Sequence, residues 1–188
     1  MEMTREDLVA LRDASVQNAV SLLHDAQLLY LGSRWAGAHG MATLAVEEAG
    51  KAWLCHQKLI GLPGITRQDL SSHAHKAIAA RQMIATVQQA SEKIFNLDEV
   101  YGEHHDYAAD CDFYLRMAGF YVDLTEHGVV GGANSITEDQ ASSSMVVAEV
   151  AVRMAKTLPE WELPDREPDQ VNAWLVNLSN RQLGKEAE

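Results

Sequence analysis

The chain has 188 residues, of which 47% are hydrophobic and 22% are charged, and its formal net charge is −12. This composition is that of one globular domain with enough apolar side chains for a core, which excludes a disordered or collagen-like chain. Because proteins that coat duplex nucleic acid are usually basic, the negative charge also argues against that class.

The charged residues are unevenly distributed along the chain. Residues 34–93 carry seven basic and four acidic side chains, whereas residues 98–126 carry eight acidic side chains and one basic one. We therefore expect any anionic ligand to bind the earlier segment.

The N-terminal residues are charged, and no apolar stretch reaches the roughly 20 residues of a membrane span. The protein is accordingly expected to be cytoplasmic and to have no membrane partner. Its two cysteines, Cys55 and Cys111, are too few for a disulfide framework or a cysteine-based zinc site.

Two long helices are predicted before residue 61. Thr4, followed by Asp7 three residues later, is typical of a helix N-cap, and apolar residues then recur at helical spacing up to Gly32. Ser33 is expected to cap a second helix that ends near Ile60, where Gly-Leu-Pro-Gly indicates a turn.

Two further predicted helices follow that turn. Thr66 and Asp69 repeat the capping pattern and predict a third helix that ends near Phe95. A fourth helix begins around Asp98 and continues through residues 121–124, and a glycine-rich loop follows over residues 127–135.

The last predicted helices lie on either side of a proline-rich segment. Residues 137–140 start a fifth helix that ends at Pro159, and Pro168 opens a short sixth one. Since no segment shows convincing strand alternation, the predicted fold is an all-α bundle of about five to six helices. Residues 1–158 are expected to form the bundle domain, and residues 159–188 a connector and a short helix packed on the same domain.

The second predicted helix is unusually rich in small residues. Gly37, Gly40 and Gly50 each cost about 1 kcal/mol relative to Ala in a helix interior, and close helix–helix approach is the expected compensation. Within the same run, Glu47 and Lys51 lie one turn apart on one face. They form either a solvated pair on an ordinary helix or a functional pair.

The third predicted helix carries His73 and Lys76 on one face, with His75 pointing elsewhere. An imidazole beside an ammonium suits phosphate chemistry, because the amine holds a non-bridging oxygen while the histidine moves a proton near neutral pH. The alternative is a histidine and a lysine on a solvated helix surface. For the same geometric reason, His73 and His75 are poor joint metal ligands.

Residues in the fourth predicted helix make a metal-dependent phosphohydrolase one alternative. Glu103 and Asp106 have a Glu-x-x-Asp spacing found in such helical enzymes, and His104 and His105 lie between them. A companion Glu-x-x-Glu is missing because Lys51 occupies its second position, and the chain contains no Glu-x-x-His motif of a ferritin-like di-iron site. We therefore expect neither a metal nor another cofactor.

Residues 32–52 hold a run of small and apolar residues that leads into Glu47-Glu48-x-Gly50-Lys51. In this run the chain resembles the abortive-infection protein V (AbiV) family of bacterial phage-defence proteins, which looks like a branch of the HEPN helical superfamily. His73-x-x-Lys76 and Tyr121-Val122-Asp123 are similar to two further motifs of that family. The likeness extends from the first predicted helix to about residue 124.

The resemblance implies an α-helical, homodimeric protein and, as in active HEPN members, a metal-independent endoribonuclease that works at the dimer interface. Those enzymes are usually marked by an Arg-x4-6-His motif. Arg34 with His39, and Arg67 with His73, have this spacing. Cleavage of this kind requires a base near the 2′-OH, an acid near the 5′ oxygen and cations around the phosphorane.

The expected site combines proton-transferring histidines, phosphate-binding cations and carboxylates that orient them. His39 or His73 would transfer protons, Arg34, Lys51 and Lys76 would bind phosphate, and Glu47 or Glu48 would orient Lys51 or an imidazole. The candidate catalytic residues are thus Arg34, His39, Glu47, Glu48, Lys51, His73 and Lys76. We expect a pocket between the second and third predicted helices.

The leading hypothesis is a phage-defence toxin of the AbiV type that cleaves RNA or otherwise disables translation. The main alternative is a non-enzymatic helical module that dimerises or binds a phage or host protein, and the acidic surface favours it. In that alternative Glu47, Glu48 and Lys51 form an internal structural network.

Overall fold

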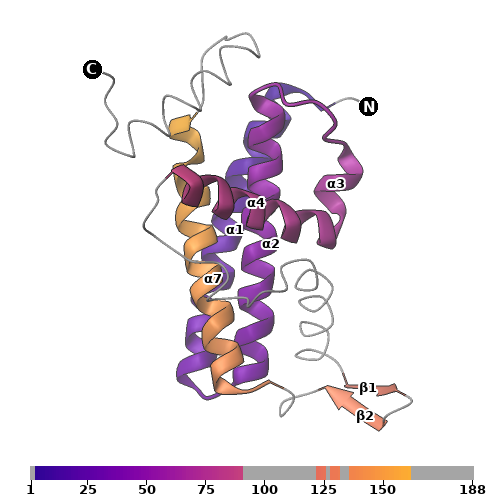
Figure 1. Cartoon of the computed structure of the whole chain (residues 1–188), viewed down its shortest axis with the longest axis vertical. Coiled ribbons are helices and arrows are strands. Elements are labelled where there is room, and N and C mark those ends of the chain that lie inside the picture. The colour runs from indigo at the N-terminus through magenta and orange to yellow at the C-terminus, as the bar shows by residue number, and fades with distance from the viewer. Residues whose placement is uncertain (1–2, 91–121, 126–127, 132–135, 162–188) are drawn as a thin grey trace.

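The structure is a computed structural model that describes residues 3–90, 122–125, 128–131 and 136–161 (Figure 1). Its elements, in chain order, are α1 (Arg5–Leu31), α2 (Trp35–Leu59), α3 (Arg67–Ser71), α4 (His73–Ala90), β1 (Val122–Thr125), β2 (Gly128–Gly131), α7 (Glu138–Thr157) and the 3-10 helix η1 (Leu158–Trp161). None of the helices within these ranges is both long and apolar enough to cross a membrane.

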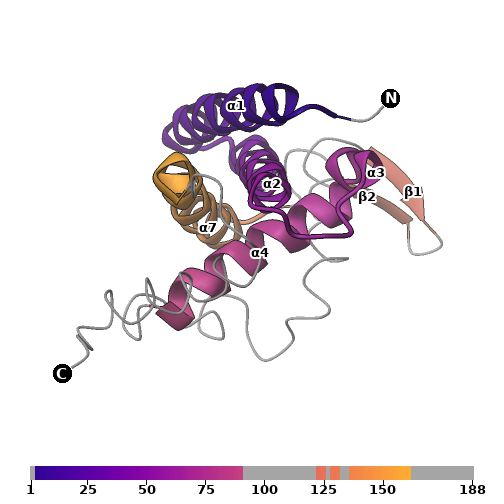
Figure 2. The same cartoon turned by 90° about the horizontal axis from the view of Figure 1, so that it is seen from above.

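Helix α2 is the centre of the bundle. It lies alongside α1 and α7, and α4 crosses both α2 and α7, as the two views show (Figures 1 and 2). Four alanines of α2 that face these neighbours have no exposed surface: Ala42, Ala45, Ala49 and Ala52. Such short side chains allow neighbouring helices to approach α2 closely, which is the predicted reason for its composition. The predicted all-α fold is confirmed.

A small β-hairpin accompanies the helices. β1 and β2 pair antiparallel, with Val122 opposite Gly131 and Thr125 opposite Gly128. The prediction that a helix continues through residues 122–124 is therefore wrong. Both strands contain β-branched residues, which favour extended backbone, but a run of four residues is too short to show strand alternation. The fourth predicted helix before residue 122, the sixth one and the connector beyond residue 161 lie outside the described residues.

The predicted starts of the first and fifth helices are confirmed at atomic level. The Thr4 hydroxyl accepts a hydrogen bond from the Asp7 backbone N–H, and the Asp7 carboxylate accepts one from the Thr4 N–H. Thr137 and Gln140 form the same reciprocal pair at the start of α7. These contacts satisfy backbone N–H groups that have no partner within the helix.

The predicted cap of the second helix is wrong. Ser33 has a positive φ of 55° and lies in the turn, and the N-cap position belongs to Arg34, whose side chain makes no capping hydrogen bond. The turn is instead held by backbone hydrogen bonds from the N–H groups of Ser33 and Arg34 to the carbonyls of Tyr30 and Leu29. A serine in the left-handed region cannot present its hydroxyl as an N-cap does.

The third predicted helix is two helices. Ser72 has extended backbone (φ −73°, ψ 123°) and separates α3 from α4. Its hydroxyl accepts a hydrogen bond from the His75 N–H at 3.3 Å, as an N-cap residue does. His73 is consequently the first residue of α4, and the chain turns sharply between Arg67 and His73.

Candidate functional site

The buried Glu47 carboxylate joins α2 to two basic residues of α4. Its side chain is 5% exposed, and its Oε2 atom accepts a hydrogen bond from His73 Nδ1 at 2.5 Å. The same oxygen lies 3.6 Å from the Lys76 Nζ atom. Because a carboxylate only accepts hydrogen bonds, Nδ1 carries the proton in neutral His73 and Nε2 carries the lone pair.

His73 and Lys76 differ in their access to solvent. The His73 side chain is 53% exposed, whereas the Lys76 side chain is 7% exposed. Glu47 compensates the buried ammonium, as a charge removed from water requires. His73 is thus the member of this cluster that a substrate can reach directly, with Glu47 behind it.

Gly50 allows the two helices to meet at this point. A Cβ atom at residue 50 would lie 1.8 Å from the Lys76 carbonyl oxygen and 2.9 Å from the Ala80 backbone nitrogen. The α4 backbone therefore occupies the space that any other residue would need for its side chain. For Gly50, this contact is the close helix–helix approach that was expected to compensate the cost of a glycine in a helix interior.

Lys51 pairs with Glu48 in the structure. Its ammonium donates to Glu48 Oε1 at 2.7 Å and to Oε2 at 2.8 Å, and both side chains are largely buried. The sequence placed Glu47 with Lys51 on the basis of i,i+4 spacing, but the Glu47 contacts described above lead to α4. The structure thus shows two carboxylate–cation clusters side by side on α2.

A second histidine–carboxylate pair holds the junction between α3 and α4. His75 Nδ1 lies 2.6 Å from Asp69 Oδ1, and Asp69 Oδ2 also accepts from the Thr66 hydroxyl and backbone N–H. Hydrogen bonds from Thr66 lower the pKa of Asp69. His73 and His75 therefore bind different carboxylates, which confirms that they point in different directions.

The structure does not bring Arg34 and His39 to this cluster. His39 is buried between α2 and α7, where its Nδ1 lies 2.6 Å from the Ser144 hydroxyl oxygen. Among the described residues its Nε2 is buried without a hydrogen-bond partner, and burial lowers the pKa of the ring. Arg34 is exposed at the start of α2, about 20 Å along the helix from Glu47 at 1.5 Å per residue.

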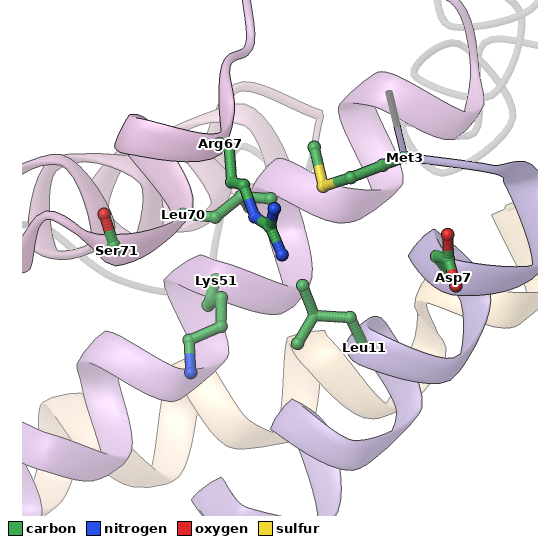
Figure 3. Close-up of a pocket in the computed structure, with 7 residues that line it drawn as sticks. All are labelled: Met3, Asp7, Leu11, Lys51, Arg67, Leu70 and Ser71. Atoms are coloured by element: carbon green, nitrogen blue, oxygen red, sulfur yellow. The ribbon is translucent and has the colours of Figure 1, made fainter. Parts of the chain in front are cut away.

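A pocket of about 440 Å³ adjoins the Lys51–Glu48 pair (Figure 3). Its walls come from the N-terminal part of α1, from Lys51 of α2 and from Arg67, Leu70 and Ser71 of α3. The guanidinium of Arg67 points into the space between Lys51 and Leu11 in Figure 3. In the sequence, the spacing of Arg67 to His73 is the signal that bears on its position here.

Metal ligands do not cluster in the described part of the chain. Within residues 3–90, 122–125, 128–131 and 136–161, no group of three or more His, Cys, Asp or Glu side chains could hold a metal ion. The alternative built on Glu103, His104, His105 and Asp106 lies outside those residues.

The HEPN_AbiV family model, described as AbiV, matches residues 7–153. The chain belongs to the AbiV family. The matched range includes all the residues of the α2–α4 clusters and the α3 residues that line the pocket. The resemblance seen in the sequence motifs therefore extends over most of the chain. Searches of curated proteins and of solved structures gave no significant match.

In this AbiV-family chain, two of the motifs that carried the resemblance meet in space. Glu47 and Gly50 of the first motif contact His73 and Lys76 of the second through side chain and backbone respectively. The third motif begins at Tyr121, outside the described residues, and its Val122 and Asp123 belong to β1. Membership points to an abortive-infection function of the HEPN type.

Proposed function

We propose that this protein acts in abortive infection as a metal-independent endoribonuclease, with His73 as its proton-transfer group. The observation that carries the proposal is the 2.5 Å hydrogen bond between His73 Nδ1 and the buried Glu47 carboxylate. A carboxylate behind a half-exposed imidazole fixes the ring tautomer and stabilises the imidazolium that forms when the ring takes a proton.

The proposed reaction is a transfer of phosphorus from the 5′ oxygen to the neighbouring 2′ oxygen of RNA. His73 Nε2 removes the 2′-OH proton as that oxygen attacks phosphorus, and the P–O5′ bond breaks. The imidazolium then returns the proton to the departing 5′ oxygen, so the products are a 2′,3′-cyclic phosphate and a 5′-OH end. No metal or external reagent is required for this balance.

Cations near His73 support the same chemistry. Lys51 pairs with Glu48 and lines the pocket, and the Lys76 ammonium lies 3.6 Å from the same Glu47 oxygen that His73 contacts. Charge develops on the non-bridging oxygens in the transition state, and fixed positive groups stabilise it. We assign Lys51 to phosphate binding and Glu47 to positioning of His73.

The test is incubation of the purified protein with total bacterial RNA in EDTA, with product ends analysed by phosphatase and kinase treatment. His73→Ala is expected to slow cleavage by at least about 100-fold, the usual contribution of a general acid–base group. His75→Ala is the matched control, because His75 is two residues away, is 51% exposed and binds a different carboxylate. It should cleave RNA at close to the wild-type rate.

Lys51→Ala should weaken cleavage, and Glu47→Gln should lower kcat more than it changes KM because Glu47 acts through His73. We expect wild-type protein to be toxic when expressed in bacteria, and His73→Ala and Lys51→Ala to lose that toxicity. Equal activity of His73→Ala and wild type, with both folded by circular dichroism, would refute the proposed site. Absence of cleavage by wild type, with or without Mg²⁺ or Mn²⁺, would favour the non-enzymatic interaction module.

A further inference from the structure

The pocket beside Lys51 has two chemically different walls. Met3, Leu11 and Leu70 supply an apolar side, and Arg67 supplies a cation that points into the space (Figure 3). Within the described part of the chain, the Arg67 guanidinium makes no hydrogen bond or ion pair. Arg67 is therefore available to an anion that enters the pocket.

We propose that this pocket binds one nucleotide of a single-stranded RNA, with its base on the apolar wall and its phosphate on Arg67. This inference rests on the proposed function, because it assumes that RNA is the substrate. A volume of about 440 Å³ lies within the roughly 300–1,000 Å³ of small-ligand pockets. Unstacked bases of single-stranded RNA pack against apolar and planar side chains, and a guanidinium fork matches phosphate oxygens.

The position of the pocket connects it to the proposed cleavage site. Ser71 lines the pocket and is two residues before His73, while Lys51 lines it one turn after Glu47. We infer that a strand with one nucleotide in the pocket continues from there toward α4, which begins at His73. Arg67 lies at the start of α3 and His73 at the start of α4, on either side of the break at Ser72.

Charge complementarity explains why a nucleotide fits better than a free inorganic anion. Asp7 lies on the pocket wall opposite the cations, and its carboxylate repels a second negative group. A ligand with one phosphate at one end and an uncharged ring at the other meets both walls favourably. A net charge of −12 disfavours binding of a polyanion over a large surface, but this pocket needs positive potential at one phosphate only.

The experiment measures binding separately from cleavage. A short fluorescent single-stranded oligonucleotide with 2′-O-methyl groups cannot be cleaved by attack of the 2′ oxygen, and its binding is followed by fluorescence anisotropy at several salt concentrations in EDTA. Arg67→Ala is expected to weaken binding by about tenfold and to lower the salt slope by about 0.7, the value for one phosphate contact on a single strand. Met3→Ala should weaken binding without changing that slope.

Arg153→Ala is the matched control for loss of one positive charge. Arg153 is 76% exposed on α7 and pairs with Glu149, so its removal should change affinity by less than about twofold. Equal binding by Arg67→Ala and wild type, an equal loss in Arg153→Ala, or no binding by wild type would each overturn the pocket assignment. If Arg67→Ala loses binding while His73→Ala still cleaves RNA, the pocket stands and the catalytic role of His73 fails.

Discussion

Gly50→Ala tests whether the contact between α2 and α4 builds the site. The added Cβ would lie 1.8 Å from the Lys76 carbonyl oxygen and 2.8 Å from the carbonyl carbon, where non-bonded atoms prefer about 3.5 Å or more. Since the obstacle is backbone, α4 must move by well over 1 Å, and the Glu47 contacts with His73 and Lys76 lengthen with it. Overpacking costs about 1–3 kcal/mol, and loss of the charged hydrogen bonds of the buried Glu47 adds about 2 kcal/mol.

The helix-propensity gain of alanine offsets about 1 kcal/mol of that cost, so we expect a net loss of about 2–4 kcal/mol in the free energy of unfolding. The assay is urea unfolding followed by far-UV circular dichroism. Gly37→Ala is the control, because its Cβ would meet only the flexible Leu29 side chain, at 3.3 Å. It should leave stability within about 1 kcal/mol of wild type or raise it. Equal stabilities of the two variants would refute the close approach of α4 at residue 50.

Three further predictions concern buried and capping residues. Burial and the nearby Arg12 charge lower the pKa of His56 to about 4, so the unfolded chain binds more protons between that pH and 6.5. The free energy of unfolding should therefore fall by about 3 kcal/mol as pH drops through that window. In His56→Phe this pH dependence should be weaker, as measured by urea unfolding at several pH values. Cys55 is fully buried, and burial raises its pKa to about 11, so iodoacetamide should label it only after denaturation, as read by peptide mass spectrometry. Thr66→Ala should cost about 1 kcal/mol of thermal stability through loss of the α3 cap.

Local sequence signals predicted the helices well where a cap and an apolar period agreed. Thr4 with Asp7 and Thr137 with Gln140 both form the expected reciprocal hydrogen bonds. The division of the third predicted helix was missed although its signal was present, because Ser72 is a good N-cap residue. Apolar residues continue at helical spacing on both sides of it, and this periodicity concealed the break.

The candidate site could be predicted in part only, because spacing reports neighbours on one helix and not contacts between helices. Residues 47 and 51 share a face, yet Lys51 binds Glu48, and Glu47 contacts His73 and Lys76 of α4. The partner of a buried carboxylate depends on which helix packs over it, and that is decided by Gly50. His39 illustrates the same limit, since its Arg-x4-His spacing cannot reveal that α7 covers it.

Glu47 and Gly50 lie three residues apart on α2, and together they make one turn of helix serve two purposes. Gly50 allows the α4 backbone to approach α2 at Lys76. This approach brings the His73 and Lys76 side chains within contact distance of the Glu47 carboxylate. Packing and positioning are thus coupled, so a variant that moves α4 loses both stability and the His73 geometry. The proposed catalytic role requires that His73→Ala loses cleavage while α4 stays in place. This variant removes a half-exposed ring and leaves the α2–α4 backbone contact unchanged. Loss of cleavage in a variant that still folds with the α2–α4 backbone contact intact therefore separates chemistry from architecture in this site.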